Sequence, residues 1–163
     1  MGVFNGRLQA DFLGPKLWRL TRSLKYNNYK LSSGEIAILR EVGVPISATG
    51  QITAPSGFET DLASVPRIVW SIIAPTDIAR AATIHDIVYR SIKQYKFNTG
   101  RSDRHLVMAA KSIGDSLMKD AMEDSDPKVP LFKQTLAYQL TKLFGHFCLK
   151  ARDYKLHNKG QKK

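Results

Sequence analysis

Residues 78–92 read I-A-R-A-A-T-I-H-D-I-V-Y-R-S-I, and this stretch decides which class of fold the sequence predicts. Apolar side chains recur in it every three or four positions, which is the period of an α-helix with one buried face. His85, Asp86 and Tyr89 interrupt this apolar pattern. Burying polar groups costs free energy unless they find partners. We therefore expect a helix over 78–92 whose polar side chains serve a purpose.

Three further helices are expected after this one. A polar linker over 93–100 leads to an amphipathic helix over 102–113, whose first residue is a serine that can cap it. A shorter helix follows over 115–123. A breaker over 124–130, which contains two prolines, precedes a last amphipathic helix over 131–149.

The residues before this helical half predict short strands. From Trp18 to Tyr29 bulky and polar residues alternate, with a turn signal at 26–28, and further short strands are expected over 36–39 and 51–53. Glycines and prolines punctuate residues 43–57. The sequence therefore predicts an α+β fold, in which a small N-terminal antiparallel β portion is followed by three to four helices.

Length and charge limit the organisation of the chain. Its 163 residues are enough for one domain with its own hydrophobic core. We expect a single domain over 1–149 and a basic C-terminal tail over 150–163, because the tail holds six Lys or Arg residues against one acid. The net charge of +11 favours an anionic partner such as nucleic acid, phospholipid headgroups or an acidic protein.

Cysteine usage argues against a fold held by disulfides within the chain, and hydropathy argues against a transmembrane helix. Cys148 is the sole cysteine, so no disulfide within the chain can staple the fold. No stretch approaches the roughly 20 apolar residues that span a bilayer, and residues 1–11 lack the charged start and apolar run of a signal peptide. We expect a protein without a transmembrane helix.

A second unusual stretch contains acidic, hydroxyl and proline side chains and is expected to form a turn. It reads G-F-E-T-D-L-A-S-V-P-R at residues 57–67. Such residues often accept hydrogen bonds from nearby backbone N–H groups or cap the next helix. Alternatively, Thr60, Asp61 and Ser64 face the helix of His85 and form a loop of the same site. The sequence leaves both interpretations open.

Several common hydrolase classes lack their signatures here. An HD-type phosphohydrolase needs histidines before its His-Asp pair, but His85 is the first histidine of the chain. Zinc motifs of the H-E-x-x-H or paired C-x-x-C type are absent, as are the G-x-S-x-G nucleophile elbow and the Gly-rich phosphate loops. His85 itself has suitable chemistry for a general base, because an unperturbed imidazole titrates at about pH 6.5.

The string at 57–67, together with A-A-T-I-H-D-I-V-Y-R at 81–90 and R-S-D at 101–103, resembles an uncharacterised family that is common in phages and prophages. The resemblance covers roughly residues 18–144. It implies a phage origin and a domain of unknown function. It also implies a location in the bacterial host cytoplasm or in the phage virion.

A second resemblance concerns the chemistry. H-D-x-x-Y on a helix, followed by an aspartate that opens a later antiparallel helix, is similar to the catalytic core of phospholipases A2. The resemblance implies that His85 is the base that activates water and that Asp86 binds calcium. Apart from the resemblance, the loop that contains Asp61 offers carbonyl oxygens and a further carboxylate for a calcium ion. The resemblance also implies that Tyr89 and Asp103 orient the imidazole, so His85 and Asp103 should lie within hydrogen-bond reach. The Gly-rich calcium loop and the disulfides of that family are absent from this sequence.

Three functions follow from these observations. The first is a phage-encoded hydrolase, a calcium-dependent phospholipase or esterase that acts on lipid or another envelope ester through a His-Asp dyad. The second is a non-catalytic virion or assembly component that contacts other phage proteins. The third is binding of a nucleic-acid backbone or another anion by Lys150, Arg152 and Lys155 in the tail. An enzyme needs an open pocket at His85, whereas a structural network buries this residue with its polar atoms paired.

Overall fold

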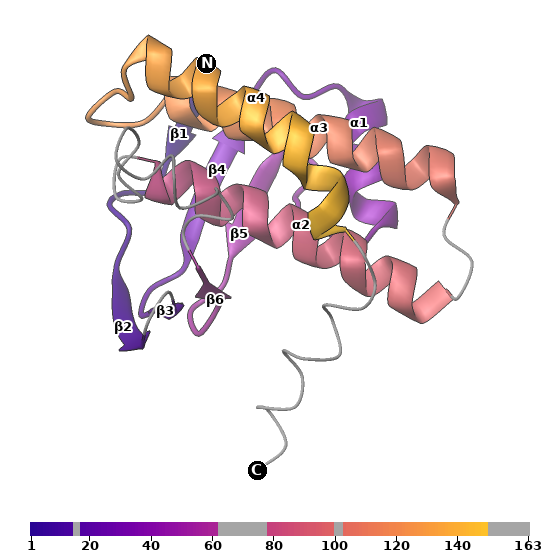
Figure 1. The fold of residues 1–163 in the computed structure, drawn as a ribbon, viewed down its shortest axis with the longest axis horizontal. Helices are drawn as coiled ribbons and strands as arrows, with labels where there is room; N and C mark the ends of the chain where they lie inside the picture. The colour runs from indigo at the N-terminus through magenta and orange to yellow at the C-terminus, as the bar shows by residue number, and fades with distance from the viewer. Residues whose placement is uncertain (15–16, 62–77, 100–102, 150–163) are drawn as a thin grey trace.

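The computed structural model describes residues 1–14, 17–61, 78–99 and 103–149 (Figure 1). The elements in chain order are β1 (Gly2–Phe4), β2 (Ala10–Gly14), β3 (Leu17–Leu20), β4 (Leu24–Asn28), α1 (Ser33–Glu41), β5 (Gln51–Ala54), β6 (Glu59–Thr60), α2 (Ala79–Thr99), α3 (Arg104–Glu123) and α4 (Leu131–Cys148). The expected α+β fold with a small N-terminal antiparallel β portion is confirmed, and one helix, α1, lies between two of its strands.

The strands form two small antiparallel sheets, ordered β1-β4-β5 and β2-β3-β6. β4 lies in the middle of the first sheet, buries every second residue and contacts α3. The turn expected at 26–28 is therefore wrong, because Tyr26 pairs with Phe4 on one side and with Ile52 on the other. Strand pairing on both sides outweighs the turn preference of the two asparagines.

The strand expected over 36–39 is also wrong, since these residues lie in helix α1. A capping box starts this helix: Ser32 Oγ accepts a hydrogen bond from the Glu35 N–H at 3.3 Å, and Glu35 Oε2 accepts one from the Ser32 N–H at 2.9 Å. The box satisfies N–H groups that the start of a helix leaves unpaired. Ile36 and Leu39 are then buried at helical spacing.

Helices α2 and α3 are both longer than the sequence pattern suggested. α2 continues through most of the expected linker to Thr99, and α3 joins the helices expected over 102–113 and 115–123. Gly114 lies inside α3, where a Cβ would come within 2.9 Å of Val88 Cγ1 on α2. A glycine within a helix costs about 1 kcal/mol relative to alanine. The close approach of α2 to α3 offsets this cost.

α3 is the central helix of the structure, because α1, α2, α4 and β4 all pack against it (Figure 1). One hydrophobic cluster runs through the β portion and the helices. Its largest fully buried side chains include Tyr26, Ile52, Ile84 and Leu117. Among the described residues, no helix is long and apolar enough to cross a membrane.

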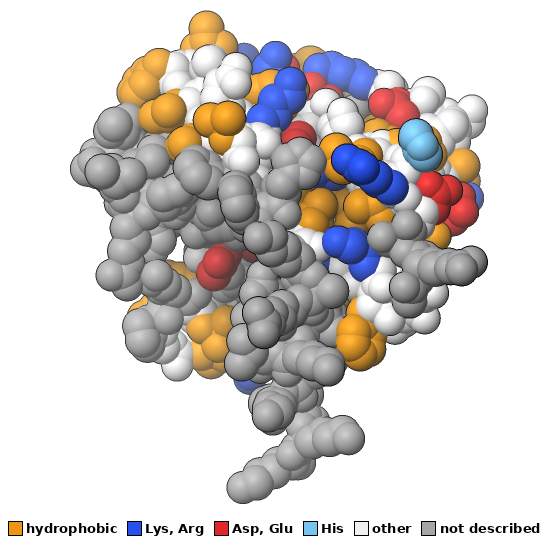
Figure 2. All heavy atoms as spheres, turned by 45° about the vertical axis from the view of Figure 1, so that its right-hand side comes forward, with side chains coloured by type: hydrophobic (Ala, Val, Ile, Leu, Met, Phe, Trp, Pro, Cys, Tyr) orange, Lys and Arg blue, Asp and Glu red, His pale blue; other side chains and the backbone are white. Residues whose placement is uncertain are grey.

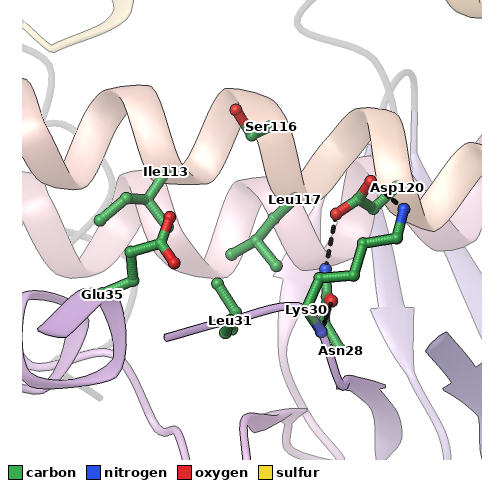
Figure 3. Close-up of a pocket in the computed structure, with 8 residues that line it drawn as sticks. All are labelled: Asn28, Lys30, Leu31, Glu35, Ile113, Ser116, Leu117 and Asp120. Carbon is green, nitrogen blue, oxygen red and sulfur yellow. Dashed lines mark hydrogen bonds and ion pairs between the residues drawn. The ribbon is translucent and has the colours of Figure 1, made fainter. Parts of the chain in front are cut away.

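The C-terminal end of α3 holds the N-terminal strand in place. Asp124 Oδ2 accepts a hydrogen bond from the Gly2 N–H at 2.6 Å and another from Tyr26 Oη at 2.8 Å. About one turn earlier, Asp120 accepts a hydrogen bond from Lys30 Nζ at 3.0 Å. Both residues of this pair line a small hollow of about 80 Å³ that α3 shares with the residues between β4 and α1 (Figure 3). The β portion is thus joined to the helices by polar contacts as well as by the core.

Replacing Gly114 by alanine should destabilise the fold, because the new Cβ would collide with Val88 where α2 packs on α3. We expect a loss of about 1–3 kcal/mol in the free energy of unfolding, measured by urea denaturation. Gly34→Ala is the matched control, since Gly34 also lies in a helix but nothing stands within 4 Å of its Cβ position. The control should be neutral or slightly stabilising. Equal losses in both variants would refute the close-packing argument.

Candidate functional site

Asp115 on α3 is the centre of a buried polar cluster, the Asp115 cluster, which also contains Lys111 on α3 and His85 and Tyr89 on α2. Asp115 Oδ1 lies 3.3 Å from His85 Nε2 and accepts a hydrogen bond from Tyr89 Oη at 2.7 Å. Asp115 Oδ2 accepts a hydrogen bond from Lys111 Nζ at 2.6 Å. His85 and Tyr89 reach the same carboxylate because they lie one turn apart on one face of α2.

The cluster places charges inside the protein. Asp115, Lys111 and His85 are 2%, 5% and 6% exposed. Burial by itself raises the pKa of Asp115, but hydrogen bonds from the imidazole, the ammonium and the phenol outweigh burial and hold this pKa below its ordinary value. Asp115 is therefore an anion at neutral pH, and the Lys111 ammonium is its counter-charge.

Helix α4 covers the Asp115 cluster through a glycine. Gly145 stands against Tyr89 Oη and Lys111, so close that a Cβ at this position would collide with the phenol oxygen and lie 3.0 Å from Lys111 Cε. A residue without a side chain is thus required for α4 to approach this part of the cluster. The resulting low-dielectric surroundings strengthen the attraction between Lys111 and Asp115.

Asp86 contacts strand β6 instead of the Asp115 cluster. Thr60 Oγ1 donates a hydrogen bond to Asp86 Oδ2, which ties the end of β6 to α2. Burial and the negative charge of Asp61 raise the pKa of Asp86 to about 6, against the opposing effect of the Thr60 hydrogen bond. The two carboxylates repel each other, so Asp86 holds its proton more tightly than an exposed aspartate does.

Arg90 fixes the same junction one turn further along α2. Its guanidinium donates a hydrogen bond to the Glu59 carbonyl oxygen, and its central carbon lies 4.2 Å from the centroid of the Phe58 ring. A guanidinium over an aromatic face gains electrostatic attraction from the ring. β6 is therefore held against α2 at Asp86 and Arg90.

The contact expected between His85 and Asp103 is wrong. Asp103 caps α3, and its carboxylate accepts a hydrogen bond from the His105 N–H at 2.8 Å. The carboxylate beside His85 belongs to Asp115, which lies 12 residues further along the chain and about 18 Å away along the helix axis. Part of this displacement comes from the length of α2, which continues seven residues, or about two turns, past its expected end at 92.

The other expected site residues fall into two groups. Thr60 and Asp61 lie at the end of β6, next to Asp86. Four expected site or tail residues and one expected helix cap lie outside the described residues, namely Ser64, Lys150, Arg152, Lys155 and Ser102. Within the described ranges, no three His, Cys, Asp or Glu side chains are grouped so that they could hold a metal ion.

Lys111 and Asp115 are candidate residues that reasoning from the sequence missed. Both stand on the apolar face of α3, in line with Val107 and Met118 at spacings of three or four residues. Charged side chains are rarely buried unless they are paired, and a lysine and an aspartate four residues apart in a helix can pair with each other. This signal was hidden because the helix break expected at 114 separated the two residues.

Asp115→Asn should destabilise the protein by about 3–5 kcal/mol, because it leaves the buried Lys111 ammonium without a counter-charge. Adding Lys111→Met should recover most of this loss, since the double variant buries no charge at these positions. Urea denaturation measures both. Because the pKa of Asp115 is lowered in the folded state, its contribution is complete above the ordinary aspartate pKa and is lost as the pH falls through the folded-state pKa. A double variant as unstable as the single one would contradict the ion-pair account.

Asp86→Asn should have the opposite effect at neutral pH. The folded-state pKa of about 6 lies above the ordinary value, so the ionised Asp86 lowers stability above this pH. The variant should be more stable than the native protein at pH 8 by up to about 2 kcal/mol, and the gain should disappear as the pH falls to about 4. Asp61→Asn should act in the same direction but less, because it lowers the pKa of Asp86. Thermal denaturation between pH 4 and pH 8 tests both, and a less stable Asp86→Asn protein at pH 8 would count against this account.

Comparison with known proteins places the described site within a family. The family model described as "Protein of unknown function (DUF1353)" matches residues 37–140, which is more than half of the chain and includes every member of the Asp115 cluster. No curated protein and no solved structure matches the chain. The expected membership in a family of unknown function is thereby confirmed, and the chain belongs to the DUF1353 family.

Proposed function

We propose that the chain is a hydrolase that cleaves an ester of a phospholipid or of another envelope component, with His85 as general base. The observation that carries this proposal is that one carboxylate, Asp115, contacts both His85 Nε2 and Tyr89 Oη. The resemblance of H-D-x-x-Y to phospholipases A2 implies an arrangement of this kind. Asp115 takes the role that was first expected of Asp103.

Asp115 determines which nitrogen of His85 carries the proton. Because Asp115 is an anion, it accepts a hydrogen bond from Nε2–H and leaves the lone pair on Nδ1. Nδ1 takes a proton from a water molecule as the water oxygen attacks the carbonyl carbon of the ester. The imidazolium, stabilised by Asp115, then returns this proton to the departing alkoxide, so the products are a carboxylic acid and an alcohol.

Tyr89 and Lys111 keep Asp115 ready for this role. Each donates a hydrogen bond to the carboxylate, and these bonds help to hold its pKa below the ordinary value. Asp115 therefore stays ionised while His85 gains and loses its proton. Two fixed donors also leave the carboxylate little freedom to rotate, so the imidazole plane is held in one orientation.

Asp86 and Asp61 are the residues that would hold a calcium ion in this proposal. Burial and the negative charge of Asp61 raise the pKa of Asp86, and a divalent cation would relieve the repulsion between the two carboxylates. Among the described residues no third acidic or imidazole side chain is grouped with them, so further ligands would be backbone carbonyl or water oxygens. A calcium ion held by these two residues would supply positive charge beside the carbonyl oxygen of the ester.

A non-catalytic virion or assembly component is the second candidate, and the burial of the cluster favours it. His85 is 6% exposed, and Asp115 is paired with three donors. A buried network of paired polar groups also serves to join helices in proteins without catalytic activity. In that case the cluster serves stability, and the protein contacts other proteins of a phage particle.

His85→Gln should abolish hydrolysis while it changes thermal stability little. Glutamine has a similar size and can still donate a hydrogen bond to Asp115, but it cannot take a proton from water. We expect a fall of roughly 10²-fold or more in the rate of hydrolysis of phospholipid and simple ester substrates in the presence of calcium. Asp103→Asn is the matched control and should retain activity, because Asp103 caps α3 far from His85.

Two outcomes would change the assignment. Equal activity with calcium and with a chelator would remove the metal from the proposal. No turnover by the native protein on any of these substrates, combined with impaired particle assembly or infectivity in His85→Gln, would favour the assembly component.

A further inference from the structure

The outward face of α4 has features that the proposed hydrolysis does not use. We propose that this face binds the surface of a membrane that contains anionic phospholipids. Membrane binding goes beyond the proposed hydrolysis and does not depend on it, because binding and cleavage are measured separately.

The outward face consists of the α4 residues that are exposed, and they lie on one side of the helix. At about 100° per residue they fall within an arc of about 120°. The members of this face are Leu131, Phe132, Thr135, Gln139, Lys142 and Leu143. The opposite side of α4 is buried, because Ala137 is fully covered.

Three large apolar side chains stand on the outward face. Leu131, Phe132 and Leu143 are 73%, 61% and 66% exposed. Single exposed apolar side chains are ordinary on protein surfaces, whereas a group of them on one face marks a surface that contacts something apolar. A helix that lies in the plane of a membrane interface buries such side chains among the acyl chains.

The charge of the helix favours an anionic membrane. α4 contains no acidic residue in 131–148 and carries Lys133 and Lys142. Residues 150–163 continue the chain beyond α4 with six Lys or Arg and one acid. In the upper part of the molecule, Figure 2 shows Lys and Arg side chains beside hydrophobic ones, with acidic side chains among them. Basic residues near a lipid surface gain attraction from anionic headgroups.

Two of the acidic residues that precede α4 in sequence, Asp120 and Asp124, are engaged with the β portion. Asp124 accepts hydrogen bonds from Gly2 and Tyr26, and Asp120 pairs with Lys30 at the hollow in Figure 3. These contacts hold the carboxylates beside the first sheet and α1. Positive charge on the outward face is therefore not cancelled by these two acids.

An anionic membrane suits the outward face better than a nucleic acid does. Proteins that follow a nucleic-acid backbone combine Lys and Arg with aromatic side chains on which bases stack. Two of the three apolar side chains here are leucines, which offer neither charge nor a stacking plane. Acyl chains accommodate Leu131, Leu143 and Phe132 equally well.

Sedimentation of the full chain with phosphatidylcholine vesicles, with and without phosphatidylglycerol, tests membrane binding. The native protein should bind vesicles that contain phosphatidylglycerol at least about tenfold more tightly than pure phosphatidylcholine. The double variant Phe132→Ser/Leu143→Ser should bind these vesicles at least about tenfold more weakly than the native protein. Lys142→Glu should lower the affinity and also make the affinity less dependent on salt. Tyr29→Ser is the matched control, since Tyr29 is 67% exposed but lies outside α4, and this variant should bind as the native protein does.

Thermal denaturation should show that these surface substitutions leave the fold intact. His85→Gln should bind vesicles as tightly as the native protein, whether or not hydrolysis is found. A native protein that ignores the anionic vesicles, or α4 variants that bind as well as it does, would overturn the proposal. Binding to double-stranded DNA that survives Phe132→Ser/Leu143→Ser, without binding to vesicles, would overturn it in favour of nucleic acid.

Discussion

The arrangement of the long helices depends on the hydrogen bonds that the buried carboxylate of Asp115 accepts. An anion at this depth is costly by several kcal/mol unless donors surround it, and its donors come from α2 as well as from α3. The two helices therefore pack in one register, the one that brings His85 and Tyr89 level with Asp115. Gly145 lets α4 close over the same point. A shift of α2 along α3 would leave a buried charge without partners, so the register is fixed by polar chemistry as well as by apolar packing.

Two aspartates with opposite properties flank His85, one in space and one in sequence. Asp115 is held below the ordinary pKa of an aspartate by its donors, whereas burial and Asp61 raise the pKa of Asp86 to about 6. Two carboxyl groups whose surroundings move their pKa values apart are typical of catalytic sites, in which one group acts as an acid and the other as a base. The same contrast explains why the two residues behave differently: Asp115 stabilises the fold as an anion, and Asp86 is at its least favourable when ionised.

Local periodicity was sufficient to predict the fold class and the helix of His85, but it was not sufficient to predict the partner of His85. Spacing along a chain determines which residues share a helix face, whereas the partner across a helix pair depends on where both helices end. The sequence placed the end of α2 seven residues too early, and the predicted partner of His85 was Asp103 instead of Asp115. The helix at 36–39 was readable in principle, because Ser32 and Glu35 have the spacing of a capping box. The pairing of Tyr26 on both sides was not readable, since it depends on strands far away in sequence.

The hydrogen bond between Gly2 and Asp124 joins residues that are 122 positions apart, which has a consequence for synthesis of the chain. On the ribosome, β1, β4 and β5 emerge well before the end of α3 is made. Until then the sheet has an uncovered face and an edge strand that lacks this contact, and such edges are sites of association between nascent or newly released chains. Closing so long a loop also slows folding. Completion of α3 is thus the step at which the β portion becomes protected, and truncation before this helix ends leaves a chain prone to aggregation.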